Sequence, residues 1–387
     1  MAIPISYNVR NLRLRLGATA MTALGIALTV SVAVFIMALL AGLRKAFVSS
    51  GDPLNVLVLR HASQTELQSG IDRGTYETIK YLPGIAKSKS GDPLASGEVV
   101  VVIMLPRNDN TGETNVTVRG MSPIGFELRP NIPLVEGRWF DTGKREIVVS
   151  KSIKSRFRKA NIGDEIFFGK GNWKVVGVFD AGDTASSSEI WADVNQMAAD
   201  FERNAAFSSV LVHATDPVAA QALKNRMQDD QRLALDALSE TDYYANQTKS
   251  GQPIQFVGTV VAIIMAVGSC FAAMNTMYAA VAYRSREIAT LRILGFSRPS
   301  IITSFVLESV LLALLGAAVG LVLMAPLNGM TTGTGNNVTF SETVFAIRIT
   351  LNVIVTAIIF AVTMGVFGGI APAWHASRRE ILAALRD

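Results

Sequence analysis

Long stretches of apolar residues without charge dominate the pattern of this chain. Three of them, at 16–43, 250–283 and 349–377, contain no Asp, Glu, Lys or Arg. A fourth, at 299–330, contains a single acid, Glu308. About 20 apolar residues suffice to cross the roughly 30 Å hydrocarbon core of a bilayer. The pattern therefore predicts four transmembrane helices, at 16–43, 251–283, 299–327 and 349–377.

Arginines gather at three edges of these spans. They precede the first span, occupy the connection between the second and third, and follow the fourth: Arg10, Arg13 and Arg15, then Arg284, Arg286, Arg292 and Arg298, then Arg378, Arg379 and Arg386. Basic residues favour the cytoplasmic side of a membrane. We therefore expect the segment 1–15, the connection 284–298 and the tail 378–387 to be cytoplasmic, and 44–250 and the loop 328–348 to lie outside. The net charge of +5 then comes from the basic residues beside the spans on the cytoplasmic side, and it does not indicate nucleic-acid binding.

The outer segment 44–250 is long enough to bury a core of its own. Both of its ends contain a β-rich run followed by a helical pattern, at 55–59 and 72–82 and again at 208–213 and 216–229. With further strands at 98–105 and 115–119, these units predict one α/β lobe assembled from both ends of the segment.

A β-rich stretch at about 122–205 separates these two ends. It contains runs at 146–149, 165–168 and 173–179, and Gly169-Lys170-Gly171-Asn172 between the last two is a hairpin signal. We interpret the stretch as an inserted second lobe. The expected fold class is an integral membrane α-helical protein with a large extracytoplasmic mixed α/β ectodomain of two lobes.

Residues for catalysis or metal binding are sparse. No G-x-x-x-x-G-K-S/T phosphate-binding loop occurs. His61, His213 and His375 are too few and too scattered to predict a zinc site. The single cysteine, Cys270, lies inside the second span and is expected to fill space rather than to react. We therefore expect a non-enzymatic chain that binds no cofactor or metal itself.

The connection 284–298 has an amphipathic pattern of its own. Ile288, Leu291, Leu294 and Gly295 recur at helical spacing on one face, while Arg286, Glu287 and Arg292 supply charge. Gly295 is a suitable helix stop, and Ser297 with Pro299 is a suitable start for the third span. We interpret the segment as a docking helix for a cytoplasmic partner. The alternative is a helix on the membrane surface with its arginines at lipid phosphates.

Small residues in the spans predict close helix contacts. Gly25 lies in the first span, and Gly316 and Gly320 form a G-x-x-x-G match in the third. These faces are expected to pack within the bundle or to form a dimer interface. Glu308 is expected to make a structural hydrogen bond, with a proton relay as the alternative.

Several of these residues carry a family resemblance. The run Arg286-Glu287-Ile288-Ala289-Thr290-Leu291-Arg292-Ile293-Leu294-Gly295-Phe296-Ser297 resembles the signature of the MacB/FtsX-type ABC transporter permeases. The segment Phe305-Val306-Leu307-Glu308-Ser309 with Gly316 and Gly320, the ending Pro372-Ala373 to Arg386, and the ectodomain run Glu136-Gly137-Arg138-Trp139-Phe140 are similar to further family patterns.

The resemblance implies a set of partners. The segment 284–298 would be a coupling helix seated on a cytoplasmic ABC ATPase, which holds ATP and Mg and is expected here to be a separate polypeptide. A second permease copy, a periplasmic adaptor and an outer-membrane duct are also implied, in a bacterial inner membrane. The long first two spans would act as stalks that carry motion outward, a scheme called mechanotransmission.

Three functions remain open from the sequence. The chain could be an export permease of the MacB type, a permease that extracts lipoproteins or other lipids from the outer leaflet, or an FtsX-like regulator of a cell-wall hydrolase. The predicted two-lobed ectodomain favours the first two.

Overall fold

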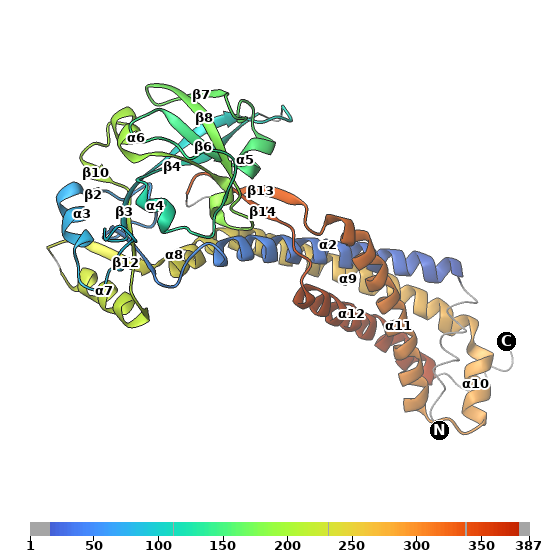
Figure 1. Cartoon of the computed structure of the whole chain (residues 1–387). Helices are drawn as coiled ribbons and strands as arrows, with labels where there is room; N and C mark the ends of the chain where they lie inside the picture. Colours follow the sequence, from blue (N-terminus) through green and yellow to red (C-terminus); the bar gives the residue numbers. More distant parts are fainter. Residues whose placement is uncertain (1–15, 111, 231, 337–338, 379–387) are drawn as a thin grey trace. The chain divides into compact units, whose positions relative to one another are not determined.

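The computed structural model describes residues 16–110, 112–230, 232–336 and 339–378 (Figure 1). The chain forms two compact units. A helical unit contains residues up to Ala41, Gln252–Met330 and the part from Ile347 onward, and an ectodomain unit contains Gly42–Gly251 and Thr331–Ala346. The segment 1–15 and the tail beyond Arg378, which were predicted to be cytoplasmic, lie outside the described residues.

The helical unit confirms the predicted spans. Within the described residues, four helices are long and apolar enough to cross a membrane. They are α2 (Leu16–Val48), α9 (Gln252–Tyr283), α11 (Arg298–Met324) and α12 (Leu351–Arg378). The first helix runs beyond the predicted end at residue 43, and its last turns, from Gly42, belong to the ectodomain unit.

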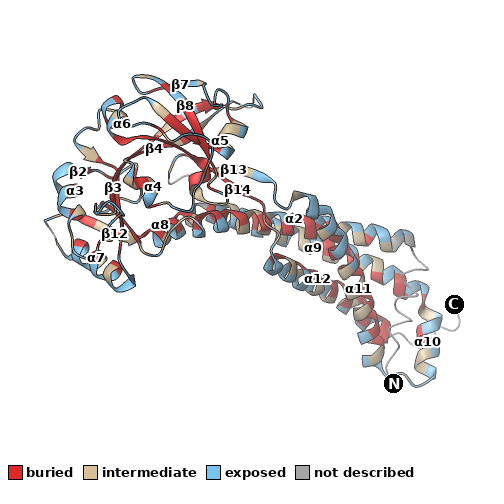
Figure 2. Cartoon of the chain, in the orientation of Figure 1, coloured by how far each residue is buried: buried red, intermediate tan, exposed pale blue. Residues whose placement is uncertain are grey.

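Large apolar side chains remain exposed on the helices of this unit, as the pale residues along α9 illustrate (Figure 2). Phe256, Ile264 and Phe271 on α9 are each at least 65% exposed. In water such a surface would drive association, whereas in a bilayer it faces acyl chains. The exposure therefore fits the spanning assignment.

The ectodomain unit is built on one long mixed sheet. In the described chain this sheet has ten strands in the order β12-β1-β11-β3-β4-β9-β6-β8-β5, with β7 also paired to β8. Its strands are β1 (Asn55–Arg60), β3 (Ala95–Pro106), β4 (Glu113–Met121), β5 (Leu134–Gly137), β6 (Glu146–Ser150), β7 (Glu165–Phe168), β8 (Gly171–Phe179), β9 (Glu189–Asp193), β11 (Ser209–His213) and β12 (Leu235–Ser239). Two short strands, β2 (Ile71–Asp72) and β10 (Ala206–Phe207), pair separately.

Short helices connect and cover these strands. They are α3 (Arg73–Lys80), α4 (Ile124–Glu127), α5 (Lys151–Arg156), η1 (Ala185–Ser188), α6 (Val194–Asp200), α7 (Pro217–Asp229), α8 (Glu240–Gln247) and η2 (Thr248–Gly251). The side chains of Asp72 and Asp216 accept hydrogen bonds at the starts of α3 and α7, which confirms both predicted helix starts. The predicted hairpin is also confirmed, because β7 pairs antiparallel with β8.

The two expected lobes share this sheet instead of forming separate sheets. One core lies around β1, β11, β12 and α7, and another lies around β4, β6, β8 and β9. Strand β3 joins them, because its first residues pair with β11 and the rest pair with β4. The β-rich core therefore begins well before residue 122, where the inserted lobe was predicted to start.

The connection 328–348 is more than the short loop expected from the sequence. After a short turn of helix, η3 (Ala325–Leu327), the chain forms a hairpin of β13 (Thr331–Gly335) and β14 (Glu342–Ala346). This β13–β14 hairpin belongs to the ectodomain unit. The sequence did not predict this hairpin, because Thr-Thr-Gly-Thr-Gly in β13 lacks the alternation of apolar and polar residues that is typical of a strand.

Candidate functional site

The predicted docking segment folds as a short helix, α10 (Ser285–Ile293), between α9 and α11. Gly295 follows it with a φ of +92°, a left-handed conformation that favours glycine and ends the helix. Ser297 then caps α11 by accepting a hydrogen bond from the backbone N–H of Ser300. The predicted stop and start are confirmed. Leu294 and Gly295 lie in the turn, not on the helical face where the sequence placed them.

The apolar face of α10 divides between two environments. Ile288 is only 4% exposed and packs into a cluster with Met277, Phe305 and Ala373 from α9, α11 and α12. The expectation that Ile288 contacts a partner is therefore wrong, because its own chain buries it. Leu291 is half buried.

The outward surface of this segment consists of other residues. Arg286 and Glu287 are exposed, and Leu294 is 64% exposed. Ile293, which was not among the predicted docking residues, is 60% exposed. Arg292 is half buried, and its guanidinium donates to the carbonyl of Phe296 at 3.2 Å. We call Arg286, Glu287, Ile293 and Leu294 the α10 outer surface.

A buried ion pair fixes the start of α10 to α11. Arg284 Nη1 lies 3.0 Å from Glu308 Oε2, and the two side chains are 9% and 7% exposed. Arg284 Nε also donates to Glu287 Oε2 at 3.0 Å, and its guanidinium lies over the Phe305 ring. The structural role expected for Glu308 therefore takes the form of an ion pair. The partner was not predicted, because Arg284 was interpreted as a marker of orientation and as part of the docking segment 284–298.

The glycines of α11 permit close contact with α2 in the same chain. A Cβ added to Gly316 would lie 2.8 Å from Ile26 Cβ, and one added to Gly320 would lie 2.8 Å from the Ala27 carbonyl oxygen. This G-x-x-x-G face is thus used within the bundle, so the dimer alternative does not apply to it. Gly25 differs, because a Cβ there would meet nothing within 4 Å.

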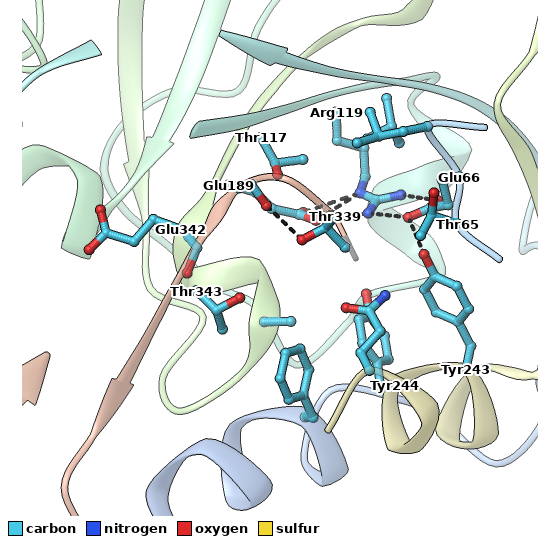
Figure 3. Close-up of a pocket in the computed structure, with 17 residues that line it drawn as sticks. Thr65, Glu66, Thr117, Arg119, Glu189, Tyr243, Tyr244, Thr339, Glu342 and Thr343 are labelled. Carbon is cyan, nitrogen blue, oxygen red and sulfur yellow. Dashed lines mark hydrogen bonds and ion pairs between the residues drawn. The ribbon is translucent and has the colours of Figure 1, made fainter. Parts of the chain in front are cut away.

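The ectodomain unit contains a second buried cluster, centred on Arg119 in β4 (Figure 3). The Arg119 guanidinium donates to Glu66 at 2.7 and 2.9 Å, to Glu98 at 2.7 Å and to Glu189 at 2.8 Å. Its Nε also donates to Glu189 at 3.2 Å, so every guanidinium nitrogen is engaged. We call Arg119 and these three glutamates the Arg119 cluster.

Two carboxylates of the Arg119 cluster, those of Glu98 and Glu189, have pKa values lowered by neighbouring arginines. Burial alone would raise the pKa of Glu98, but attraction to Arg129 and Arg119 outweighs it and holds the pKa below its ordinary value. The pKa of Glu189 is likewise lowered, because Arg119 outweighs the effect of burial. Nearby Glu240 in α8 behaves differently: burial raises its pKa despite Arg129 and a hydrogen bond from Asn55.

The cavity beside the Arg119 cluster is too small for a substrate. Its volume is about 40 Å³, and its lining includes Glu66, Arg119, Tyr243 and Tyr244. Thr65 Oγ1 in the lining is buried and has no hydrogen-bond partner within the described residues. A space of this size suits a few ordered waters. Among all residues that the structure describes, no group of three or more His, Cys, Asp or Glu side chains is arranged to hold a metal ion.

Comparisons with known proteins agree with these features. A family model described as the MacB-like periplasmic core domain matches residues 19–230, and one described as the FtsX-like permease C-terminal matches residues 259–381. The chain is 25% identical to the macrolide export ATP-binding/permease protein MacB of Rhodopseudomonas palustris over 70% of its own length and 43% of that protein. It is 26% identical to the uncharacterized ABC transporter permease YknZ of Bacillus subtilis over 71% of its own length and 70% of that protein.

Among solved structures, the extracellular domain of the ABC-type transporter YknZ aligns with a TM-score of 0.36 and 17% identity, covering 48% of this chain and all of that domain. The chain spans less than half the length of the MacB protein that it matches. Four apolar helices and matches to both family models, in chain order, identify a membrane protein with a periplasmic-type domain. The chain belongs to the MacB/FtsX-type family of ABC transporter permeases.

Proposed function

We propose that this chain couples ATP hydrolysis by a cytoplasmic ABC ATPase to a conformational change of its periplasmic domain, and that this change exports a periplasmic or outer-leaflet substrate. The observation that carries the proposal is the construction of α10. Ile288 and the Arg284–Glu308 pair anchor this helix to three spans, while the α10 outer surface remains exposed. A partner that moves α10 therefore moves the bundle.

The remaining parts of the proposal follow from the family and from charge. The basic connections favour a cytoplasmic α10, with both termini on the same side of an inner membrane. We propose an ATPase that binds ATP and Mg, a second copy of the permease, and a periplasmic adaptor with an outer-membrane duct. Because the MacB relatives are named as export proteins, export is the first function to test. Extraction of lipoproteins from the outer leaflet is the second.

The first experiment tests docking. The cognate ATPase is captured from native membranes by the tagged chain and identified, and capture is then repeated with Ile293→Asp and Leu294→Asp combined. Two new charges in an apolar contact are expected to lower capture at least tenfold, since burying each unpaired charge costs about 1–3 kcal/mol or more. The control is Phe167→Asp, at a 72% exposed apolar position of the ectodomain. Unchanged capture by the double variant would favour the membrane-surface alternative for α10.

The second experiment tests coupling without knowledge of the cargo. Hydrogen exchange of ectodomain amides is measured in the assembled complex with and without trapped nucleotide. A Gly-Gly insertion after Gln255 in α9 weakens helix stiffness, at about 1 kcal/mol for each glycine relative to alanine. ATP turnover should persist, and the nucleotide-dependent exchange change should disappear. A wild-type complex whose ectodomain never responds to nucleotide would contradict coupling altogether.

A further inference from the structure

The β13–β14 hairpin links two spans through the ectodomain. The chain leaves α11 through η3, forms the hairpin, and enters α12 after residue 350. The hairpin is nevertheless part of the ectodomain unit, together with Gly42–Gly251. Because α11 directly follows α10, the hairpin ends a second covalent route from the α10 outer surface to the ectodomain, in addition to the route through α9.

Charge fixes the hairpin inside the ectodomain unit. Glu342 in β14 pairs with Arg107 Nη2 at 2.5 Å and also with Arg156 Nη2. Its side chain is 4% exposed, and the two arginines are 25% and 19% exposed. Arg107 follows β3 and Arg156 ends α5, so one carboxylate ties the hairpin to two separate segments.

Hydrogen bonds add to this attachment. The backbone N–H of Val344 donates to Ser188 Oγ at 2.7 Å, and Asn115 Nδ2 donates to the carbonyl of Phe340 at 2.7 Å. All five residues of β14 are buried. A strand held in this way moves with the sheet that buries it.

The hairpin also lies against the Arg119 cluster. Thr339, Ser341, Glu342 and Thr343 line the same cavity as Glu66 and Arg119 (Figure 3). Ser188, which holds β14, directly precedes Glu189 of the cluster. The last residue of α8, Gln247, and Phe47 near the end of α2 line this cavity as well.

The end of α2 touches the hairpin closely. A Cβ added to Gly42 would lie 2.0 Å from the Ala346 carbonyl oxygen, so no larger residue fits without movement. The hairpin, the end of α2 and α8 thus meet around one polar core within the ectodomain unit.

We propose that the β13–β14 hairpin is a strap that transmits motion of the α11–α12 pair to the periplasmic domain, with Glu342 as the positioning residue that keeps it attached. This inference rests on the proposed function and adds a third connection to those made by α2 and α9. The strap works by staying bound through the cycle. Its release uncouples the domain while leaving the ATPase contact intact.

The test uses Glu342→Gln, which removes the charge and preserves the shape. In the assembled complex, ATPase capture and ATP turnover should match wild type, and the nucleotide-dependent exchange change in β9 and α8 should fall at least fivefold. The matched control is Glu136→Gln. It removes the 2.6 Å ion pair between Lys154 and Glu136, in which the Glu136 side chain is 51% exposed. This control should leave the nucleotide response unchanged. A full response in Glu342→Gln overturns the strap.

A second variant keeps the test decisive if Glu342→Gln disturbs the fold. In a Cys270→Ala background, Ser188→Cys and Val344→Cys are combined with Glu342→Gln, and formation of the cross-link is verified by mass spectrometry. The oxidised cross-link should restore the nucleotide response, and reduction should abolish it again. Failure of the formed cross-link to restore the response overturns the strap.

The stalk insertion separates the two proposals. If Gly-Gly after Gln255 abolishes the response and Glu342→Gln does not, the strap is wrong and the coupling function stands. If the wild-type complex shows no response to nucleotide, both are wrong.

Discussion

Removing either member of the Arg284–Glu308 pair should destabilise the helical unit, and by unequal amounts. Both side chains are more than nine-tenths buried and lie 3.0 Å apart. Breaking such a pair by removing one partner costs about 3–5 kcal/mol. Arg284→Met removes the guanidinium that faces the buried Glu308 carboxylate. Glu308→Gln leaves Arg284 its second pair with Glu287, whose side chain is 56% exposed. We therefore expect Arg284→Met to lower the free energy of unfolding by about 4 kcal/mol, and Glu308→Gln to lower it by about 3 kcal/mol.

Replacing both charges should restore most of the loss. Buried pairs exchanged for apolar residues of similar volume are often neutral or stabilising, by about 1–4 kcal/mol. The double variant Arg284→Met with Glu308→Met should therefore lie within about 1 kcal/mol of wild type. The measurement is the free energy of unfolding of the full chain in detergent micelles. Glu287→Gln is the surface control, with an expected change below about 1 kcal/mol.

The same double variant separates anchoring from proton transfer. If Glu308 only anchors α10, the double variant should still capture the ATPase and show a nucleotide response in the ectodomain. A stable double variant that has lost the response would support the proton-relay alternative. Single variants as stable as the Glu287→Gln control would refute the reasoning about the buried pair itself.

Three further predictions follow from the packing and from the shifted pKa values. Gly320→Val should destabilise the helical unit by about 1–3 kcal/mol, because the added Cβ would meet the Ala27 carbonyl oxygen. The control is Gly268→Val, because a Cβ there meets nothing within 4 Å. Equal losses of unfolding free energy in detergent for the two variants would contradict the prediction. Glu98 and Glu189 have lowered pKa values, so their ionised forms stabilise the folded state above the ordinary value of 4.5, and this stabilisation is lost as pH falls through their pKa values in the folded protein. Glu98→Gln should therefore make the unfolding midpoint less dependent on pH in the acid range. Glu240 has a raised pKa, so the folded state binds its proton more tightly and gains stability as pH falls through that raised value toward 4.5; Glu240→Gln should remove this gain, and an unchanged pH profile would contradict the assignment.

Sequence patterns were sufficient wherever a single element determines the outcome. Uncharged length predicted the spans, because charge is costly, and therefore rare, in a helix that crosses a bilayer. The helical patterns at 72–82 and 216–229 predicted where α3 and α7 start, because the caps that Asp72 and Asp216 form there are local contacts. Gly295 predicted the end of α10 for the same reason.

Patterns failed where the partner of a residue lies far along the chain. The periodicity around Ile288 correctly identified an apolar face, but periodicity does not tell whether the chain itself or another protein covers that face. Arg284 and Glu308 lie on different helices, so no spacing rule joined them. The Arg119 cluster draws on residues from 66 to 189, and its sequence signal was the charge of Glu98, Arg119 and Glu189 inside apolar strands.

The discontinuous make-up of the ectodomain unit determines when it can be completed during synthesis. Its residues 42–251 emerge first, and its last strand pair follows only after the chain has passed through α9, α10 and α11. Until then Arg107 and Arg156 lack the Glu342 carboxylate, and the sites that bury β14 stay open. A nascent chain must therefore place two spans in the bilayer before the domain can close. Chains stalled before residue 342 would therefore carry an ectodomain whose β14 site is still open.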